Sequence, residues 1–76
     1  MPTVFREAGL RLIIYVDDHP PPYVHIEGKG GYAKIAIDGP VLVWNRGVSR
    51  GDMKIALDAV SSRRSELLQA WTAIHG

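Results

Sequence analysis

Residues 23–37 read YVHIEGKGGYAKIAI, two runs of alternating character joined by a glycine-rich turn. A two-residue turn at Lys29-Gly30 predicts three opposed pairs: Glu27 with Tyr32, His25 with Lys34, and Tyr23 with Ala36. In that register the other face of both strands is apolar, and a slip of one residue would mix the two faces. This apolar face consists of Val24, Ile26, Ala33, Ile35 and Ile37. The sequence therefore predicts an antiparallel hairpin whose apolar face lies on the core.

The segments on either side of this hairpin also predict strands. Residues 4–6 and 10–16 are separated by Ala8-Gly9, and the second run is rich in β-branched and aromatic residues. The prolines at 20–22 enforce an extended connection to the central hairpin. Beyond it, residues 38–40 predict a turn, residues 41–44 a strand and residues 45–47 a loop.

The C-terminal third predicts a helix. Ser49 is a candidate N-cap, with Asp52 three residues later. Apolar residues then recur near every 3.6 positions from Met53 through Trp71, so the stripe continues across the polar residues 61–64. We therefore expect one long helix, straight or kinked near Ser61-Ser62, rather than two separate helices.

Together these elements predict a single α+β domain over residues 1–76. A small antiparallel meander of four to five strands occupies residues 3–44, and the helix at 50–74 packs on its apolar face. At 76 residues the chain has room for one core only. Trp44 and Trp71 could each anchor an interface, but in so small a domain the core is the favoured place for both, Trp71 especially because it lies on the helical stripe.

Composition narrows the classes of function. The chain has no cysteine, which excludes disulfides and thiolate metal sites. A formal charge of +1 gives no indication of nucleic acid or an anionic membrane as a partner. The apolar runs are far shorter than the roughly 20 residues of a membrane span, and the first residues lack a basic-then-apolar signal layout. We therefore expect a cytoplasmic protein without membrane association.

Most of the side chains that could titrate or bind a ligand lie on the predicted outer face of the hairpin. Histidine is the side chain best placed to titrate or bind metal near neutral pH, and two of the three histidines flank the proline run. With the following loop, the candidate functional face consists of His19, Tyr23, His25, Glu27, Lys34, Asn45 and Arg46.

Several motifs together resemble a known family. They are the opening MPTVFR, Asp18-His19, Pro21-Pro22-Tyr23-Val24-His25, Asn45-Arg46-Gly47 and the run LLQAW at 67–71. Across nearly its whole length the chain resembles the short bacterial proteins of domain-of-unknown-function family 4160. Members tend to be encoded beside another small protein, so the resemblance implies a partner-dependent, toxin–antitoxin-like role. The family commonly has His-x-His after the proline pair, whereas this chain has Tyr23-Val24-His25.

The residues of the candidate face suggest two kinds of chemistry, metal binding and acid–base catalysis. Tetrahedral zinc would need three or four ligands to converge from His19, His25, Asp17, Asp18 and Glu27. Since the two aspartates also serve to end a strand, we predict no metal site and no cofactor. Alternatively, His19 and His25 could act as base and acid in RNA cleavage, with Lys34 or Arg46 stabilising the phosphate. This small ribonuclease is the alternative function, and enzymatic activity stays open.

An interaction module is the favoured hypothesis. Three consecutive prolines flanked by His19 and Tyr23 form a stiff surface that a partner can bind at low entropic cost, although the same run also serves simply to shape a turn. The sequence thus predicts an interaction component of a two-protein system, with a small protein as its partner. Homodimerisation is left open, and nucleic acid is the weaker candidate ligand.

Overall fold

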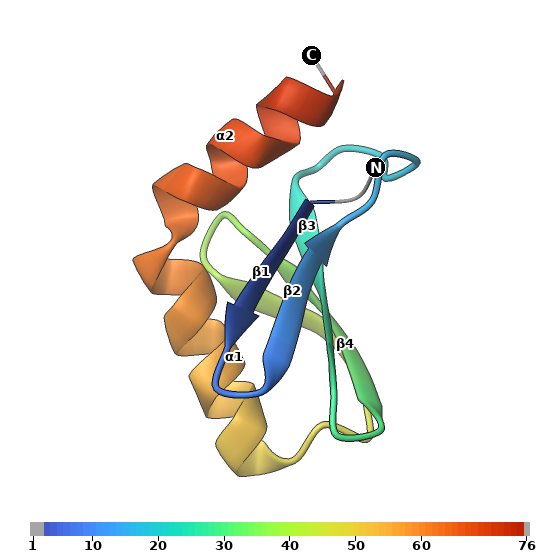
Figure 1. Ribbon diagram of the computed structural model, residues 1–76, viewed down its shortest axis with the longest axis vertical. Coiled ribbons are helices and arrows are strands. Elements are labelled where there is room, and N and C mark those ends of the chain that lie inside the picture. Colours follow the sequence, from blue (N-terminus) through green and yellow to red (C-terminus); the bar gives the residue numbers. More distant parts are fainter. Residues whose placement is uncertain (1–2, 76) are drawn as a thin grey trace.

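A computed structural model describes residues 3–75 of the chain; of the predicted domain, residues 1, 2 and 76 lie outside this range. Its strands form one antiparallel sheet in chain order, followed by two helices that cover one face (Figure 1). The elements are β1 (Thr3–Glu7), β2 (Leu10–Ile14), β3 (Tyr23–Gly28), β4 (Gly31–Ala36), β5 (Val41–Arg46), α1 (Arg50–Ser62) and α2 (Arg64–His75). The predicted α+β class and the five-stranded meander are confirmed.

The central hairpin has the predicted register. β3 pairs with β4 so that Glu27 opposes Tyr32, His25 opposes Lys34, and Tyr23 opposes Ala36. Lys29 and Gly30 both have positive φ angles, 53° and 81°, which is the backbone of a two-residue I′ turn. The Lys29 ammonium also lies 3.2 Å from the Asp52 carboxylate at the start of α1, so the turn is tied to the helix.

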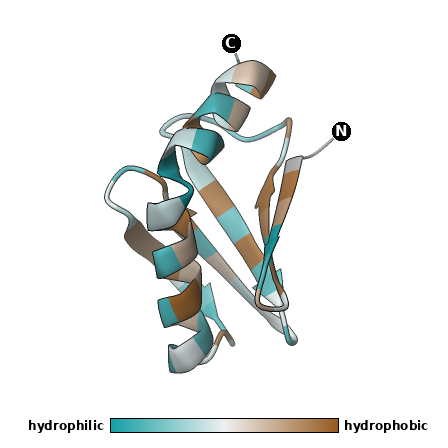
Figure 2. Cartoon of the chain, turned by 60° about the vertical axis from the view of Figure 1, so that its left-hand side comes forward, coloured by the Kyte–Doolittle hydropathy of each residue, from teal (hydrophilic) through white to brown (hydrophobic). Residues whose placement is uncertain are grey.

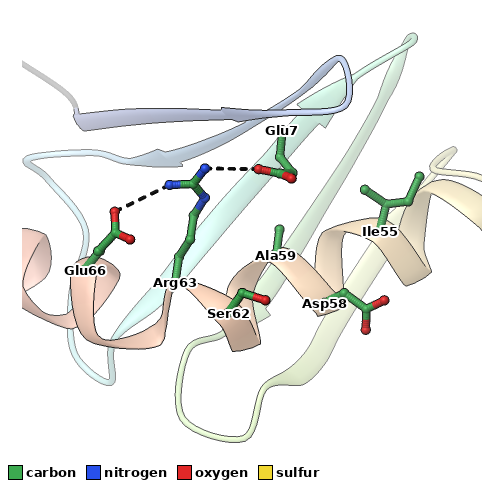
Figure 3. A pocket seen from close by; sticks show the side chains of 7 residues that line it. All are labelled: Glu7, Ile55, Asp58, Ala59, Ser62, Arg63 and Glu66. Carbon is green, nitrogen blue, oxygen red and sulfur yellow. Dashed lines mark hydrogen bonds and ion pairs between the residues drawn. The ribbon is translucent and has the colours of Figure 1, made fainter.

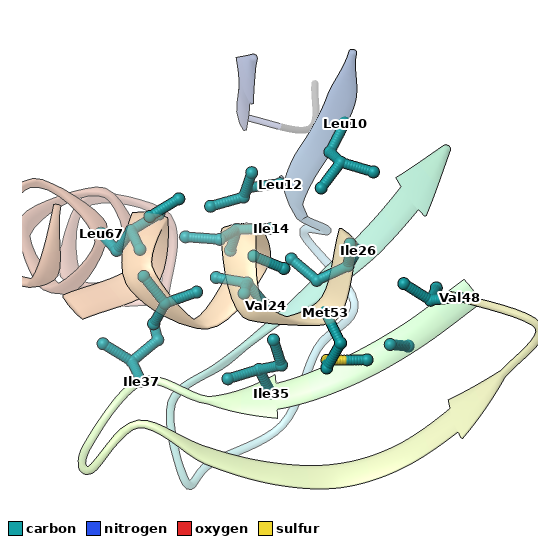
Figure 4. Close-up of a cluster of buried hydrophobic side chains, with 14 of the residues drawn as sticks. Leu10, Leu12, Ile14, Val24, Ile26, Ile35, Ile37, Val48, Met53 and Leu67 are labelled. Carbon is teal, nitrogen blue, oxygen red and sulfur yellow. The ribbon is translucent and has the colours of Figure 1, made fainter. Parts of the chain in front are cut away.

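The core lies between the sheet and the helices. All five apolar residues predicted for the inner face of the hairpin are fully buried. β2 contributes every second residue to the same layer, and the alternation is visible as bands along the strands (Figure 2). Figure 4 shows these side chains meeting those of the helices. The helical part of the cluster consists of Met53, Ala56, Ala59, Val60, Leu67 and Trp71.

Several boundaries differ from the sequence-based predictions. β2 ends at Ile14, whereas the sequence predicted this strand to continue to residue 16. Asn45 and Arg46 do not lie in a loop but belong to β5, where they pair with Ala33 and Tyr32 of β4. The predicted C-terminal helix is present in two pieces, α1 and α2, which meet at a bend at Arg63, next to the kink position expected near Ser61-Ser62 (Figure 1). Arg63 leaves helical geometry with φ −103° and ψ 18°, although its N–H still bonds the Ala59 carbonyl.

Tertiary contacts account for the bend at Arg63. Its guanidinium lies between two carboxylates, 3.1 Å from Glu7 on β1 and 3.4 Å from Glu66 on α2 (Figure 3). It also lies over the Phe5 ring, 5.7 Å from the ring centroid. Arg63 and the two carboxylates line a hollow of about 450 Å³ between β1 and the helices. Arg63 therefore links the first strand to both helices at the point where the helical axis turns.

The start of α1 is capped as predicted. The Ser49 hydroxyl accepts a hydrogen bond from the Asp52 N–H at 3.2 Å, and Ser49 itself has an extended backbone. Ser49→Ala should lower the free energy of unfolding by about 1 kcal/mol, because the first turn loses a partner for one of its free N–H groups. Urea unfolding followed by circular dichroism measures this loss. Ser61→Ala, in the exposed last turn of α1, is the control, and equal losses in the two variants would contradict a capping role.

Candidate functional site

Asp18 is the centre of a polar and aromatic cluster beside the proline run. Its side chain is almost fully buried and accepts hydrogen bonds from the Tyr15 N–H at 2.9 Å and the Tyr23 hydroxyl at 3.0 Å. The Nε2 atom of His25 lies 3.5 Å from the same carboxylate. The His25 ring also sits edge-on between Tyr15 and Tyr23, with centroid distances of 5.1 and 5.2 Å. The cluster therefore fixes the end of β2 and the proline run to the start of β3.

Tyr23 joins this cluster to the helical layer. Its ring lies 5.6 Å from the Trp71 ring of α2, centroid to centroid, and Tyr23 is half-buried against the core. Burial, and then the hydrogen bond and charge of Asp18, raise the pKa of the Tyr23 phenol above its ordinary value. The neutral phenol is thus held as a hydrogen-bond donor to Asp18.

Tyr23→Phe tests this role through the pH dependence of stability. Folding raises the pKa of the Tyr23 phenol. The contribution of this group to the free energy of unfolding is therefore complete below about pH 10, and it is lost as the pH rises through the raised pKa. At neutral pH the variant should lose about 1 kcal/mol of unfolding free energy, since Asp18 loses a donor. Urea unfolding at neutral and alkaline pH should show a smaller alkaline loss in the variant than in the wild type. With exposed Tyr32→Phe as control, an unchanged alkaline loss in Tyr23→Phe would refute the account.

Lys34 and His19 lie on the other side of Tyr23. The Lys34 ammonium sits 3.8 Å from the centroid of the Tyr23 ring, a cation–π contact. His19, Pro20 and Pro21 complete a hollow of about 320 Å³, the proline-side hollow, with Ala36 and Val43. Three of the predicted face residues, His19, Tyr23 and Lys34, are therefore brought together, while the imidazole of His25 is directed to Asp18.

The remaining predicted residues do not join them. Glu27 forms an ion pair with Arg11 on the neighbouring strand β2. Asn45 makes two hydrogen bonds with the Val48 backbone, at 2.9 and 3.0 Å, and so shapes the connection into α1. Arg46 lies over the Trp44 ring at 5.5 Å from its centroid. Within residues 3–75, no group of three or more histidine or acidic side chains is placed to hold a metal ion.

The strand β5 was predicted, but sequence reasoning missed its exposed position at the edge of the sheet. It is an edge of the sheet, and its four leading residues are all apolar and exposed: Val41 at 56%, Leu42 at 40%, Val43 at 52% and Trp44 at 38%. Trp44, expected in the core, therefore lies on the surface. The opposite edge strand β1 differs because Arg6 and Glu7 occupy it and Arg63 ties it to the helices. The exposure of β5 depends on its position at the edge of the sheet, and a run of four apolar residues does not reveal that position.

β5 presents apolar side chains on both of its faces because its side chains alternate, and its pairing with β4 contains a bulge. Lys34 opposes Trp44 and Ile35 opposes Leu42, so Val43 is the additional residue. Val43 lines the proline-side hollow on the outer face, the face turned away from the helices. Leu42 instead lines a groove of about 420 Å³ with Met53 and Leu57 of α1, here called the helix-side groove. β5 is thus flanked by one apolar recess on each side of the sheet.

Comparison with known proteins identifies one family for this chain. No helix in the described part of the chain has the length and hydrophobicity needed to span a membrane. Neither the curated proteins nor the solved structures contain a significant match. The family model described as domain of unknown function DUF4160 matches residues 9–72, from the turn before β2 to the middle of α2. The chain therefore belongs to the DUF4160 family.

Proposed function

We propose that this protein is an interaction component of a cytoplasmic two-protein system in bacteria, toxin–antitoxin-like, and that it binds a small protein partner. The exposed apolar edge strand β5 supports this most directly. A free sheet edge carries unpaired N–H and C=O groups, which native proteins usually protect with charge, short length or a covering element. On β5, four successive apolar side chains stand beside that edge instead.

The proline run supports the same function from the neighbouring surface. Pro20 and Pro21 share the proline-side hollow with Val43, so the stiff connection and the edge strand form one continuous surface. A partner bound there gains apolar contacts while ordering little of this chain. The tight cluster around Asp18 keeps the proline run in place.

Purification of the tagged protein from its own host, with and without nuclease, tests this function. We expect a small protein to co-purify in stoichiometric amount and to survive nuclease treatment, as mass spectrometry would show. Recovery of the protein alone, or of a partner that nuclease removes, would contradict the proposal.

The small ribonuclease is retained as a second candidate because one hollow gathers His19, Tyr23 and Lys34. An imidazole and an ammonium group at one site suit acid–base work on a phosphodiester. If this candidate holds, the purified protein cleaves short RNA, and His19→Ala and His25→Ala abolish cleavage without unfolding the domain. If neither protein nor variant cleaves RNA, the candidate fails, while loss of folding in His25→Ala would make His25 structural.

A further inference from the structure

We infer that β5 binds an acidic segment of the partner in extended conformation, as an added sixth strand of the sheet. This inference rests on the proposed function and specifies the chemistry of the partner. It is carried by three observations on the described residues: the free edge of β5, the two recesses that flank it, and an excess of positive charge around them.

The edge position determines the conformation of the bound segment. β5 pairs with β4 on one side, and within residues 3–75 no strand pairs with its other side. An added strand would satisfy those backbone groups, as in other proteins that bind extended peptides at a sheet edge. Its side chains would alternate between the two faces of the sheet.

The two recesses determine where those side chains go. On the helix side, they would meet Leu42, Met53 and Leu57 in the groove between β5 and α1. On the outer face, they would meet Val43 and the prolines of the proline-side hollow. Both recesses offer mainly apolar contact, so the segment needs apolar residues on both faces at its centre.

The charges around β5 determine the sign of the charge that the bound segment should carry. Arg50 and Lys54 line the helix-side groove, Lys34 lines the proline-side hollow, and Arg46 ends the strand. None of these four side chains forms an ion pair within residues 3–75. Asp58 is the one acidic residue lining either recess. Since the chain as a whole carries only +1, this excess is a local feature and favours glutamate or aspartate in the bound segment.

A protein segment fits this surface better than RNA or a second copy. RNA would meet the basic groups but would leave the apolar side chains of Val41, Leu42 and Val43 without apolar contacts. A second copy would bring an equally basic edge against this one, and the bulge at Val43 disfavours pairing between two identical edges.

Selection from a displayed library of random peptides, about a dozen residues long and panned against the full chain, tests the inference. We expect enriched peptides to combine alternating apolar residues with glutamate or aspartate. The double variant Arg50→Glu, Lys54→Glu should reverse this preference toward lysine and arginine, and should weaken a selected acidic peptide at least about tenfold. Arg6→Glu, on the opposite edge strand β1, is the control and should keep the acidic preference.

The outcomes separate this inference from the proposed function. Selection without enrichment, enrichment without acidic bias, or an acidic bias that survives the double variant would each overturn the inference. Displacement of a selected peptide by short RNA would overturn the inference in favour of RNA. A dimer that light scattering detects and that prevents peptides from binding to β5 would overturn it in favour of a second copy. A partner that co-purifies from the host while β5 selects no acidic peptide would leave the proposed function standing and remove only this binding mode.

Discussion

Replacing Trp71 by alanine is expected to lower the free energy of unfolding by about 3–5 kcal/mol. The Trp71 side chain is 6% exposed and anchors α2 to the sheet. Its ring lies 5.6 Å from Tyr23 and stacks on His75 at 3.9 Å, centroid to centroid. For a domain whose total stability is on the order of 4–11 kcal/mol, this loss removes from about a quarter to all of the free energy of unfolding.

The second tryptophan provides the matched control. Trp44 is 38% exposed on β5, so Trp44→Ala removes fewer contacts and should cost about 1 kcal/mol or less. Urea unfolding of both variants, followed by circular dichroism, compares the two losses directly. If Trp71→Ala does not fold, the milder variant Trp71→Phe takes its place in this comparison. Similar losses for Trp44→Ala and Trp71→Ala would contradict the assignment of Trp71 to the core and Trp44 to the surface.

Gly31→Ala is expected to destabilise the domain by about 3 kcal/mol, through close approach of two backbone segments. A Cβ atom at Gly31 would lie 2.7 Å from the carbonyl carbon of Gly47 and 2.7 Å from the nitrogen of Val48. These are backbone atoms, and Asn45 holds Val48 through both its N–H and its carbonyl, so the segment cannot move aside cheaply.

Gly51→Ala is the control for this substitution. A Cβ atom at Gly51, in the first turn of α1, would meet nothing within 4 Å. Alanine is the better helix former there, so Gly51→Ala should be neutral or stabilising by up to about 1 kcal/mol. Thermal unfolding of the two variants gives the comparison. If Gly31→Ala melts at the wild-type temperature, the packing of the hairpin on the Gly47–Val48 connection is incorrect.

The central hairpin was predictable from sequence because two independent constraints agree there. The Lys29-Gly30 turn fixes the strand ends, and the alternation of apolar residues permits one register only. Ser49 was predictable for a similar reason, because an N-cap depends on residues within one helical turn. Local chemistry thus determined these features.

The sequence allowed a kink near Ser61-Ser62, next to the observed bend, but it did not indicate the contacts that Arg63 makes there. No glycine or proline marks the position, and the apolar period continues through it. The bend accompanies contacts of Arg63 with Phe5 and Glu7, more than fifty positions away in the chain. Local propensity alone therefore favoured a continuous helix over residues 50–74.

The candidate site was predictable only in part. Alternation placed His25 opposite Lys34, and the structure confirms that pairing. The sequence indicates for Asp18 a metal ligand or the end of a strand, whereas its buried carboxylate organises Tyr15, Tyr23 and His25. Val41–Trp44 read as an ordinary strand, because the sequence does not state which strand lacks a neighbour. Both the role of Asp18 and the edge position of Val41–Trp44 depend on how the strands assemble into the sheet, which local sequence does not reveal.

The most direct test of the role of β5 is capture of a partner from the host by three tagged proteins: wild type, Val43→Glu and Val4→Glu. Both valines are exposed on edge strands, so each glutamate should leave the fold intact, which circular dichroism verifies. We predict that Val43→Glu lowers the recovered partner at least about tenfold, because it places a charge in the apolar centre of the interface, and this charge has the same sign as the proposed acidic segment. Val4→Glu, on β1, should recover as much partner as the wild type. Equal recovery by Val43→Glu and the wild type would contradict binding through β5.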